Sequence, residues 1–307
     1  MFEVVFLGTS ASAPSAKRNL PALVVMHDEY RFLIDCGEGT QRQILQSGIG
    51  FKRLNRILIT HGHLDHILGL AGLLSTFMRW ESIEELEIAG APGAIDRIRD
   101  LLYGVVLRGN RPPMPVKLRV LFPGLVFDGP DFTITAFHVH HRGAESLGYI
   151  FEEKGRRPFL PEKAEALGIP PGPWRRDLVE GRAATLPDGR VIQPADVLGE
   201  FHPGTRLVVV GDSGETDSLV EVCRGADGLV IESTYLDEET EMARQFGHLT
   251  ARDSANLALR AGVGQLLLTH ISRRYREKDV QQEAQDVFPN TIVARDFDTF
   301  QIKRSGE

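Results

Sequence analysis

Residues 57–66 read Ile57-Leu58-Ile59-Thr60-His61-Gly62-His63-Leu64-Asp65-His66, an apolar strand pattern that runs directly into three histidines and an aspartate. Imidazole and carboxylate groups suit zinc and related transition metals, and a strand that delivers them onto a short loop fixes their directions. His61 and His63 share strand parity and can reach one ion, whereas Asp65 and His66 can reach a second ion about 3.5 to 4 Å away. The stretch therefore predicts a two-metal site, and a solvated His-rich surface loop is the weaker interpretation.

Three later segments also read as apolar strands that end in a side chain able to bind a metal. Residues 132–141 end in His138-Val139-His140-His141, residues 207–212 end in Asp212, and residues 266–270 end in His270. Together with the first segment, they resemble the HxHxDH signature and the later ligands of the metallo-β-lactamase superfamily. That resemblance implies an α/β fold, the αβ/βα four-layer sandwich of the superfamily.

Composition narrows the class of protein. The 307 residues carry a formal net charge of -7 and are 42% hydrophobic, which allows a sizeable core and argues against a chain that coats nucleic acid over its whole surface. Cys36 and Cys223 have no paired spacing, so a disulfide framework and a cysteine zinc cluster are disfavoured. The chain enters a strand-like run directly, and no stretch reaches the roughly 18 apolar residues of a membrane span. We therefore expect a cytoplasmic protein with no membrane partner.

The first third of the chain alternates short β-rich runs with helical patterns, which is typical of layered α/β folds. Strands are expected at residues 3–7, 22–26, 31–34 and 56–60. A helix is expected from Asp65 onward, and its predicted apolar face consists of Leu70, Ala71, Leu74 and Phe77. Another helix is expected at residues 251–261, with Thr250 as N-cap and Asp253 in the capping-box position.

The segment 152–194 differs from the rest of the chain. It holds seven of the 17 prolines and five glycines, and its eight Lys/Arg against seven Asp/Glu give +1, which leaves -8 for the remainder. Such a segment does not form regular core structure, and we interpret it as an arm inserted into a single domain that spans residues 1–307. A disordered linker is the alternative, but Trp174 and Leu178 look like anchors that a linker would not need.

The motifs narrow the choice within the superfamily. Residues 33–41, Leu33-Ile34-Asp35-Cys36-Gly37-Glu38-Gly39-Thr40-Gln41, resemble the DCGEGTQ motif of ribonuclease Z, the endonuclease family that trims the 3′ trailer from precursor tRNA. Further segments that resemble family motifs follow in the right order: Leu7-Gly8-Thr9-Ser10, Gly211-Asp212-Ser213, Ile231-Glu232-Ser233-Thr234-Tyr235, Gly247-His248-Leu249-Thr250-Ala251 and Thr269-His270-Ile271-Ser272-Arg273-Arg274-Tyr275. The similarity spans nearly the whole chain, and segment 152–194 resembles the family's flexible arm, which grips the tRNA body.

The chain also departs from the family pattern. The family commonly has glycine at the position of Leu64 and proline at the position of Ala71. It commonly has an aromatic residue followed by glycine where this chain has Ile67-Leu68. Ile271 replaces a phenylalanine, and the lysine of the loop 14–19 comes one place later than expected. None of these residues is a ligand, so they bear on substrate preference more than on the type of reaction.

The resemblance implies a cofactor of two Zn²⁺ per chain. His61, His63 and His141 would bind one zinc, Asp65, His66 and His270 the other, and Asp212 would bridge both. A hydroxide activated by the two metals would attack the phosphodiester, because bound metals lower the pKa of water to about 7. Asp65 is also the candidate acceptor of the proton from the attacking water.

Other polar residues are candidates for proton transfer or for holding the ligands in place. His248 is the candidate acid that protonates the leaving oxygen, since the family places a histidine in this motif, and Glu232 could orient it. Alternatively, His248 is an ordinary residue ahead of a helix cap, and Glu232 simply ends its strand. Asp35 is expected to hold a ligand or its loop rather than a metal. Strand alternation groups His141 with Phe137 and Val139, so His138 and His140 face the other way, and we expect them at the surface or in a layer behind the ligands.

The expected partner is precursor tRNA. Arg18 lies in the loop 14–19, which resembles the family loop near the tRNA 3′ end, and just after His270 an arginine fork could hold a phosphate. The remaining candidate contacts are Ser272, Arg274 and Tyr275 after His270, and Arg175 and Arg176 in the arm. The family also implies a homodimer in which the arm of one subunit serves the active site of the other.

Two other functions stay open from the sequence. One is a phosphodiesterase or arylsulfatase-like hydrolase of small esters on the same scaffold, which would have no use for a basic arm. The other is a structural or RNA-binding relative that has lost its metals, which the seven candidate ligands disfavour. The sequence does not determine the metal used in vivo, the substrate range, or whether precursors that contain CCA are cut.

Overall fold

The computed structural model describes residues 1–80 and 83–304 and contains two compact units. One unit comprises residues 1–152 together with the described part of 205–307, and the other comprises residues 153–204. Within the described ranges, we find no helix that is both long enough and apolar enough to cross a membrane.

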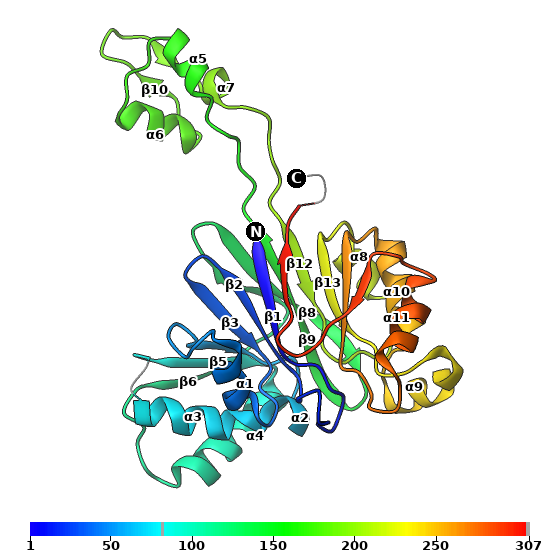
Figure 1. Cartoon of the computed structure of the whole chain (residues 1–307). Helices are drawn as coiled ribbons and strands as arrows, with labels where there is room; N and C mark the ends of the chain where they lie inside the picture. Colours follow the sequence, from blue (N-terminus) through cyan, green and yellow to red (C-terminus); the bar gives the residue numbers. More distant parts are fainter. Residues whose placement is uncertain (81–82, 305–307) are drawn as a thin grey trace. The chain divides into compact units, whose positions relative to one another are not determined.

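The larger unit is built on two seven-stranded sheets (Figure 1). The first has the order β16-β1-β2-β3-β4-β5-β6, with bounds β1 (Phe2–Gly8), β2 (Ala22–His27), β3 (Tyr30–Ile34), β4 (Arg56–Leu58), β5 (Leu86–Gly90), β6 (Val116–Val120) and β16 (Thr299–Ile302). The second has the order β15-β14-β13-β12-β9-β8-β7, with bounds β7 (Gly124–Asp128), β8 (Phe132–His141), β9 (Ala144–Glu153), β12 (Arg206–Val209), β13 (Gly228–Glu232), β14 (Gln265–Thr269) and β15 (Thr291–Val293). In each sheet the four strands at one end run parallel, β3 to β6 in the first and β12 to β15 in the second.

Helices cover the outer face of each sheet (Figure 1). Those of the first half are α1 (Thr40–Ser47), α2 (Leu64–Ile67), α3 (Gly69–Trp80), α4 (Pro92–Arg99) and η1 (Asp100–Leu107). Those of the second half are α8 (Leu219–Cys223), η2 (Asp237–Glu239), α9 (Thr240–Phe246), α10 (Ala251–Ala261) and α11 (Glu277–Gln285).

Strands in the middle of this unit are buried on both faces, which explains their nearly continuous apolar sequences. On β1, Val4 and Phe6 face the core between the sheets, whereas Val5 and Leu7 pack with the helices of the first half. In the second sheet, Val209 joins the core between the sheets and Val208 packs with the helices of its own half. The layers are therefore helix, sheet, sheet, helix, and the predicted αβ/βα sandwich is confirmed.

The predicted elements match the structure closely in most places. The four strands expected in the first third lie in β1 to β4 with ends that differ by at most two residues. The helix expected at residues 251–261 is α10, and Thr250 caps it by accepting from the Asp253 N–H (3.1 Å) while Asp253 accepts from the Thr250 N–H (3.1 Å). On α3, Leu73 is buried and Ala71 is only partly buried, so the apolar face lies slightly to one side of the predicted one.

The helix expected from Asp65 onward is broken in two. The Gly69 N–H bonds to the Cys36 carbonyl oxygen (2.8 Å), which lies outside the helix, so α2 ends at Ile67 and α3 begins at Gly69. A Cβ at position 69 would lie 2.0 Å from the carbonyl oxygen of Gly37, so only glycine allows the two segments to approach this closely. The break frees the short helix α2 to orient Asp65 and His66 independently of the long helix.

The smaller unit has its own hydrophobic core, so the prediction that segment 152–194 does not form regular core structure was wrong. It contains α5 (Pro161–Ala166), α6 (Pro173–Val179), the hairpin of β10 (Ala184–Thr185) and β11 (Val191–Ile192), and α7 (Pro194–Val197). Leu178 is fully buried in this core and Trp174 packs against it, as their predicted role as anchors requires. Backbone bonds between Arg156 and His202 (2.9 and 2.8 Å) pair the two segments that enter and leave the unit. The segment predicted as an arm, 152–194, thus lies almost wholly in a unit that continues to Gly204.

Candidate metal centre

The seven candidate ligands come together from both halves of the sandwich. The first half supplies His61 and His63 after β4 and Asp65 and His66 on α2, and the second half supplies His141 at the end of β8, Asp212 after β12 and His270 after β14. Their nitrogen and oxygen atoms form two groups, each within 4.8 Å: His61, His63, His141 and Asp212 in one, and Asp65, His66 and His270 in the other. A third group overlaps both, because it combines Asp212 and His270 with His248. The site is therefore assembled only when the two sheets pack.

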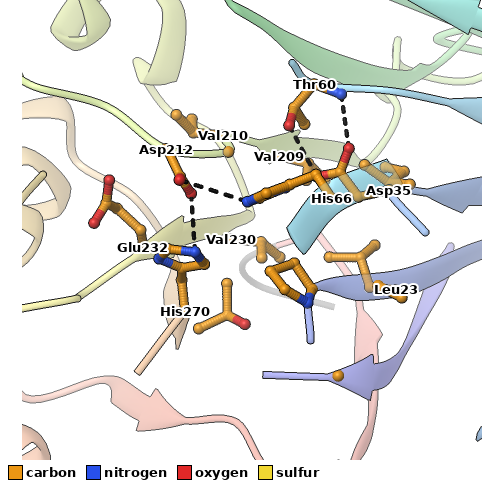
Figure 2. A pocket seen from close by; sticks show the side chains of 16 residues that line it. Leu23, Asp35, Thr60, His66, Val209, Val210, Asp212, Val230, Glu232 and His270 are labelled. Carbon is orange, nitrogen blue, oxygen red and sulfur yellow. Dashed lines mark hydrogen bonds and ion pairs between the residues drawn. The ribbon is translucent and has the colours of Figure 1, made fainter. Parts of the chain in front are cut away.

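Asp212 lies between the two groups. Its Oδ2 is 3.6 Å from His61 Nε2 and 3.5 Å from His66 Nε2, and its Oδ1 is 3.4 Å from His270 Nε2. Figure 2 shows Asp212 between His66 and His270, with one carboxylate oxygen directed at each ring. The carboxylate thus contacts members of both groups, which is the position that a bridging ligand requires.

Asp65 joins the second group from the other side. Its Oδ2 lies 3.7 Å from His66 Nε2 and 3.6 Å from His270 Nε2. The same oxygen accepts a hydrogen bond from the Ser12 N–H (3.1 Å). The loop after β1 therefore reaches the metal centre, a contact that the sequence analysis did not foresee.

Several ligand atoms are buried without any hydrogen-bond partner among the described residues. They are His61 Nε2, His66 Nε2, His270 Nε2 and Asp212 Oδ1. Buried polar atoms are normally paired, because an unpaired one costs about 1–3 kcal/mol. Four such atoms directed into one small space, all of them imidazole nitrogens or carboxylate oxygens, fit a site for transition-metal ions.

Asp35 organises the first half of the site. Its carboxylate accepts hydrogen bonds from the Thr60 N–H (2.8 Å), the Thr60 hydroxyl (2.8 Å) and His66 Nδ1 (2.8 Å). Thr60 Oγ1 also lies 3.0 Å from His61 Nδ1. Asp35 bonds directly to the ligand His66 and has positive φ (57°), which aspartate tolerates better than most residues. It therefore holds two histidines, as predicted for a residue that supports the ligands.

Glu232 plays the corresponding part in the second half. Its carboxylate contacts His248 Nδ1 at 3.0 and 3.1 Å and accepts from the Ser213 N–H (2.7 Å) and the Thr234 hydroxyl. Thr234 Oγ1 lies 2.9 Å from His270 Nδ1. Glu232 is fully buried, so its contact with His248 is a defined interaction rather than the end of a strand exposed to solvent.

The electrostatics of these groups follow from their burial and mutual charge. Burial lowers the pKa of His61 well below its ordinary value. Burial also lowers the pKa of His248, but the charge and hydrogen bond of Glu232 outweigh it and raise the pKa to about 9. Burial raises the pKa of Asp65, but the hydrogen bond and charge of His270 and the charge of His66 outweigh it and hold the carboxyl well below its ordinary range.

The three clustered histidines of β8 separate as expected. His141 is buried, and its Nδ1 donates to the Gly247 carbonyl oxygen (2.8 Å), which leaves Nε2 directed at His63 Nδ1 (3.3 Å). His138 and His140 are exposed and contact one another away from the ligand groups. Only His141 belongs to the site.

Arg18 has intramolecular partners. Its guanidinium donates to the Thr9 hydroxyl (2.6 Å), the Ala294 carbonyl oxygen (2.6 Å) and Glu277 (2.8 Å), and burial lowers its pKa. It lines a hollow of about 830 Å³ with Lys17 and Arg273, beside the loop that carries Ser12. The contact predicted between Arg18 and RNA stays a prediction, and in this arrangement the side chain supports the hollow's wall.

The other predicted RNA contacts lie in three settings. Ser272 and Tyr275 line the same hollow, whereas Arg274 bonds to Glu239 (3.1 Å). In the arm, Arg175 donates to the Ile169 carbonyl oxygen (2.8 Å), which ties it to its own unit. Arg176 is exposed and forms an i,i+4 ion pair with Glu180 (2.8 Å). The structure thus places Ser272 and Tyr275 in the hollow that Arg18 also lines, and the RNA contacts of all these residues stay predictions.

Sequence reasoning missed Thr60, Thr234 and Ser12. Thr60 and Thr234 each lie one or two residues from a ligand or a carboxylate in motifs that were recognised, so their positions were a usable signal. Ser12 had none, because its contact with Asp65 joins residues 53 positions apart.

The sequence of this chain is similar to those of known proteins. The family model described as Anti-Pycsar protein Apyc1 matches residues 2–111, which is about a third of the chain. The ribonuclease Z of Bradyrhizobium sp. (strain ORS 278) is 49% identical over 302 residues, which cover 98% of this chain and 100% of that protein.

Solved structures extend the comparison to the fold. Human tRNase Z, short form, superposes with a TM-score of 0.69 at 26% identity and covers 98% of this chain and 99% of that chain. The metallo-beta-lactamase fold protein YhfI from Bacillus subtilis has a TM-score of 0.70 at 19% identity over 98% and 100%, a likeness of fold alone. The resemblance noted in the sequence is confirmed, and the chain belongs to the ribonuclease Z family of the metallo-β-lactamase superfamily.

Proposed function

We propose that this chain is a zinc-dependent endoribonuclease that removes the 3′ trailer from precursor tRNA and leaves a 3′-hydroxyl on the tRNA. The observation that carries the proposal is the convergence of four buried, unpartnered ligand atoms on one space. The chain that forms this site is 49% identical, over almost its full length, to a protein named ribonuclease Z. The cytoplasmic location expected from the sequence stays a prediction.

Two Zn²⁺ ions would be held by this chain, one by His61, His63 and His141 and the other by Asp65, His66 and His270, with Asp212 shared. When bound, such ions supply an activated water at neutral pH and neutralise charge on phosphoryl oxygens. The two groups that contain the seven ligands support two ions, and the contacts of Asp212 with both support its sharing. His248, in the third group, has its Nδ1 bonded to Glu232, which supports a role other than that of a ligand.

Two further side chains would move protons. Asp65 would accept the proton of the attacking water, since its carboxylate lies at the edge of the ligand groups and is only partly buried. His248 would donate a proton to the leaving oxygen. His248 Nδ1 is hydrogen-bonded to Glu232, so Nε2 is the nitrogen that would face the substrate. The His248 ring contacts the rings of His141 and His270.

The small-ester hydrolase considered from the sequence has no observation of its own in its favour. Relatives that are 49%, 42% and 38% identical to this chain over nearly its full length bear the name ribonuclease Z. The direct test is incubation of the purified chain with a precursor tRNA and mapping of the product ends. Cleavage that leaves a 3′-hydroxyl at the end of the mature tRNA would support the proposal, and hydrolysis of small phosphodiesters without cleavage of precursor tRNA would refute it.

The arm, defined as residues 153–204, would bind the tRNA body, and in a homodimer it would serve the active site of the partner subunit. Its separate hydrophobic core supports a folded binding module, and its segment 152–194 is less acidic than the rest of the chain. Arg176 is the more exposed of its two predicted phosphate contacts.

Mixed dimers test the action in trans. Asp212→Ala and an arm deletion are each expected to be inactive on tRNA, but a dimer that contains one of each has an intact metal centre facing an intact arm. Cleavage should therefore reappear when subunits exchange. Verified mixed dimers without activity, or a chain that is only monomeric in solution, would refute this arrangement.

A further inference from the structure

Two buried threonines beside the metal centre have no part in the mechanism above. Thr60 follows β4 in the first half of the sandwich, and Thr234 follows β13 in the second half. Their side chains are almost completely buried, with exposed fractions of 1% and 4%. Each hydroxyl lies between a buried carboxylate and a histidine of the metal centre, so the two halves contain matching arrangements.

In the first half, the Thr60 hydroxyl is 2.8 Å from Asp35 Oδ2 and 3.0 Å from His61 Nδ1. A hydroxyl has one hydrogen, and a carboxylate can only accept it. If Thr60 donates to Asp35, the hydrogen in the contact with His61 must come from the imidazole. His61 then carries its proton on Nδ1, and Nε2 presents a lone pair to the ligand group.

The second half gives the same result. The Thr234 hydroxyl can donate to Glu232 Oε2 or to the His270 carbonyl oxygen (3.2 Å), and both of these are acceptors only. In either case the contact of 2.9 Å with His270 Nδ1 requires the imidazole to donate. His270 Nε2 is therefore the unprotonated nitrogen, and it is one of the buried atoms without a partner.

We propose that Thr60 and Thr234 are positioning residues that fix His61 and His270 in the tautomer with the proton on Nδ1, one in each half of the site. The inference rests on the proposed binding of metals by these histidines. His66 and His141 achieve the same state through direct bonds to Asp35 and to the Gly247 carbonyl. In each half, one carboxylate therefore orients two imidazole rings, one by a direct bond and one through a threonine hydroxyl. Asp35 orients His66 and His61, and Glu232 orients His248 and His270.

The test compares a variant that removes the hydroxyl with one that keeps it. Thr60→Val and Thr234→Val keep the branched shape, whereas Thr60→Ser and Thr234→Ser keep the hydroxyl. Zinc affinity is measured by competition with a fluorescent chelator. The valine variants are expected to bind zinc about 10- to 100-fold more weakly, and the serine variants to regain most of the affinity. Thr291→Val is the matched control, because Thr291, in β15, is a buried threonine whose hydroxyl donates to the Phe288 carbonyl oxygen.

A second measurement does not depend on any variant. In the full-length wild-type chain, treated with chelator and labelled with ¹⁵N-histidine, NMR at mildly alkaline pH should show His61 and His270 protonated on Nδ1. Protonation of either on Nε2, unchanged zinc affinity in the valine variants, or serine variants as weak as the valine ones would overturn the inference. A chain that passes these tests and leaves precursor tRNA intact would instead contradict the proposed function.

Discussion

Replacing Asp35 by asparagine tests how the first half of the site is held. The aspartate accepts three hydrogen bonds, two from Thr60 and one from His66. With the amide oxygen in place of Oδ2, the bonds from the Thr60 hydroxyl and His66 remain. The amide nitrogen then faces the Thr60 N–H, so two buried donors, the new amide group and the Thr60 N–H, are left without an acceptor. At about 1–3 kcal/mol for each, the free energy of unfolding should fall by about 2–6 kcal/mol.

That loss is a large part of the roughly 5–15 kcal/mol that stabilises an ordinary domain. Because asparagine tolerates positive φ, the backbone at position 35 adds no cost of its own. Zinc should also bind about 10- to 100-fold more weakly, since the acceptor for His66 Nδ1 is no longer a carboxylate. Urea unfolding and chelator competition measure the two effects.

Asp28→Asn is the matched control for Asp35→Asn. Asp28 also has positive φ (49°), but its side chain is exposed. Its replacement should change the free energy of unfolding by less than about 0.5 kcal/mol. If Asp35→Asn has an effect as small as this control, and zinc binds it as tightly as the wild-type chain, the carboxylate of Asp35 does not hold the ligands in the way described.

Three further changes test the proposed chemistry. Asp212→Ala should lose zinc from both groups and all cleavage activity. Elemental analysis measures the zinc content, and a variant that keeps two zinc ions and stays active would contradict the shared role of Asp212. His248→Ala should slow cleavage of an unactivated phosphodiester by about 10²–10⁴-fold and affect an aryl leaving group much less, whereas equal losses would count against an acid. Residues 157–201 can be deleted and replaced by a short glycine link between the paired Arg156 and His202. Hydrolysis of a small chromogenic phosphodiester should be unchanged and cleavage of tRNA should be weaker. An equal loss of activity on both substrates would show that the arm stabilises the main unit.

The sequence predicted the parts of the site that lie close together in the chain. His61 to His66 occupy six consecutive positions, and the strands that carry His141, Asp212 and His270 have apolar sequences that end at the ligand. Strand periodicity therefore predicted an α/β class and the candidate ligands at the strand ends, whereas the αβ/βα sandwich was implied by the resemblance to the superfamily. The same periodicity could not predict the break before Gly69, because that break depends on a carbonyl of Cys36 more than 30 residues earlier.

Contacts between distant segments were the least predictable. Arg18 looked like an RNA contact in its loop, yet its guanidinium bonds to Ala294 and Glu277, which the fold brings in from the other half of the sequence. Thr234 was visible within a recognised motif, but its role depends on the pairing of β13 with β14, which places it beside His270. A local pattern predicts which side chains are present, and only the packed sheets determine which of them meet.

The most direct test of the two-metal site is a crystal structure of the zinc-loaded chain with anomalous data collected at the zinc edge. Two peaks are predicted, one bound by His61, His63 and His141 and one by Asp65, His66 and His270, with Asp212 bound to both. A single peak, or a second ion held away from these ligands, would contradict the account.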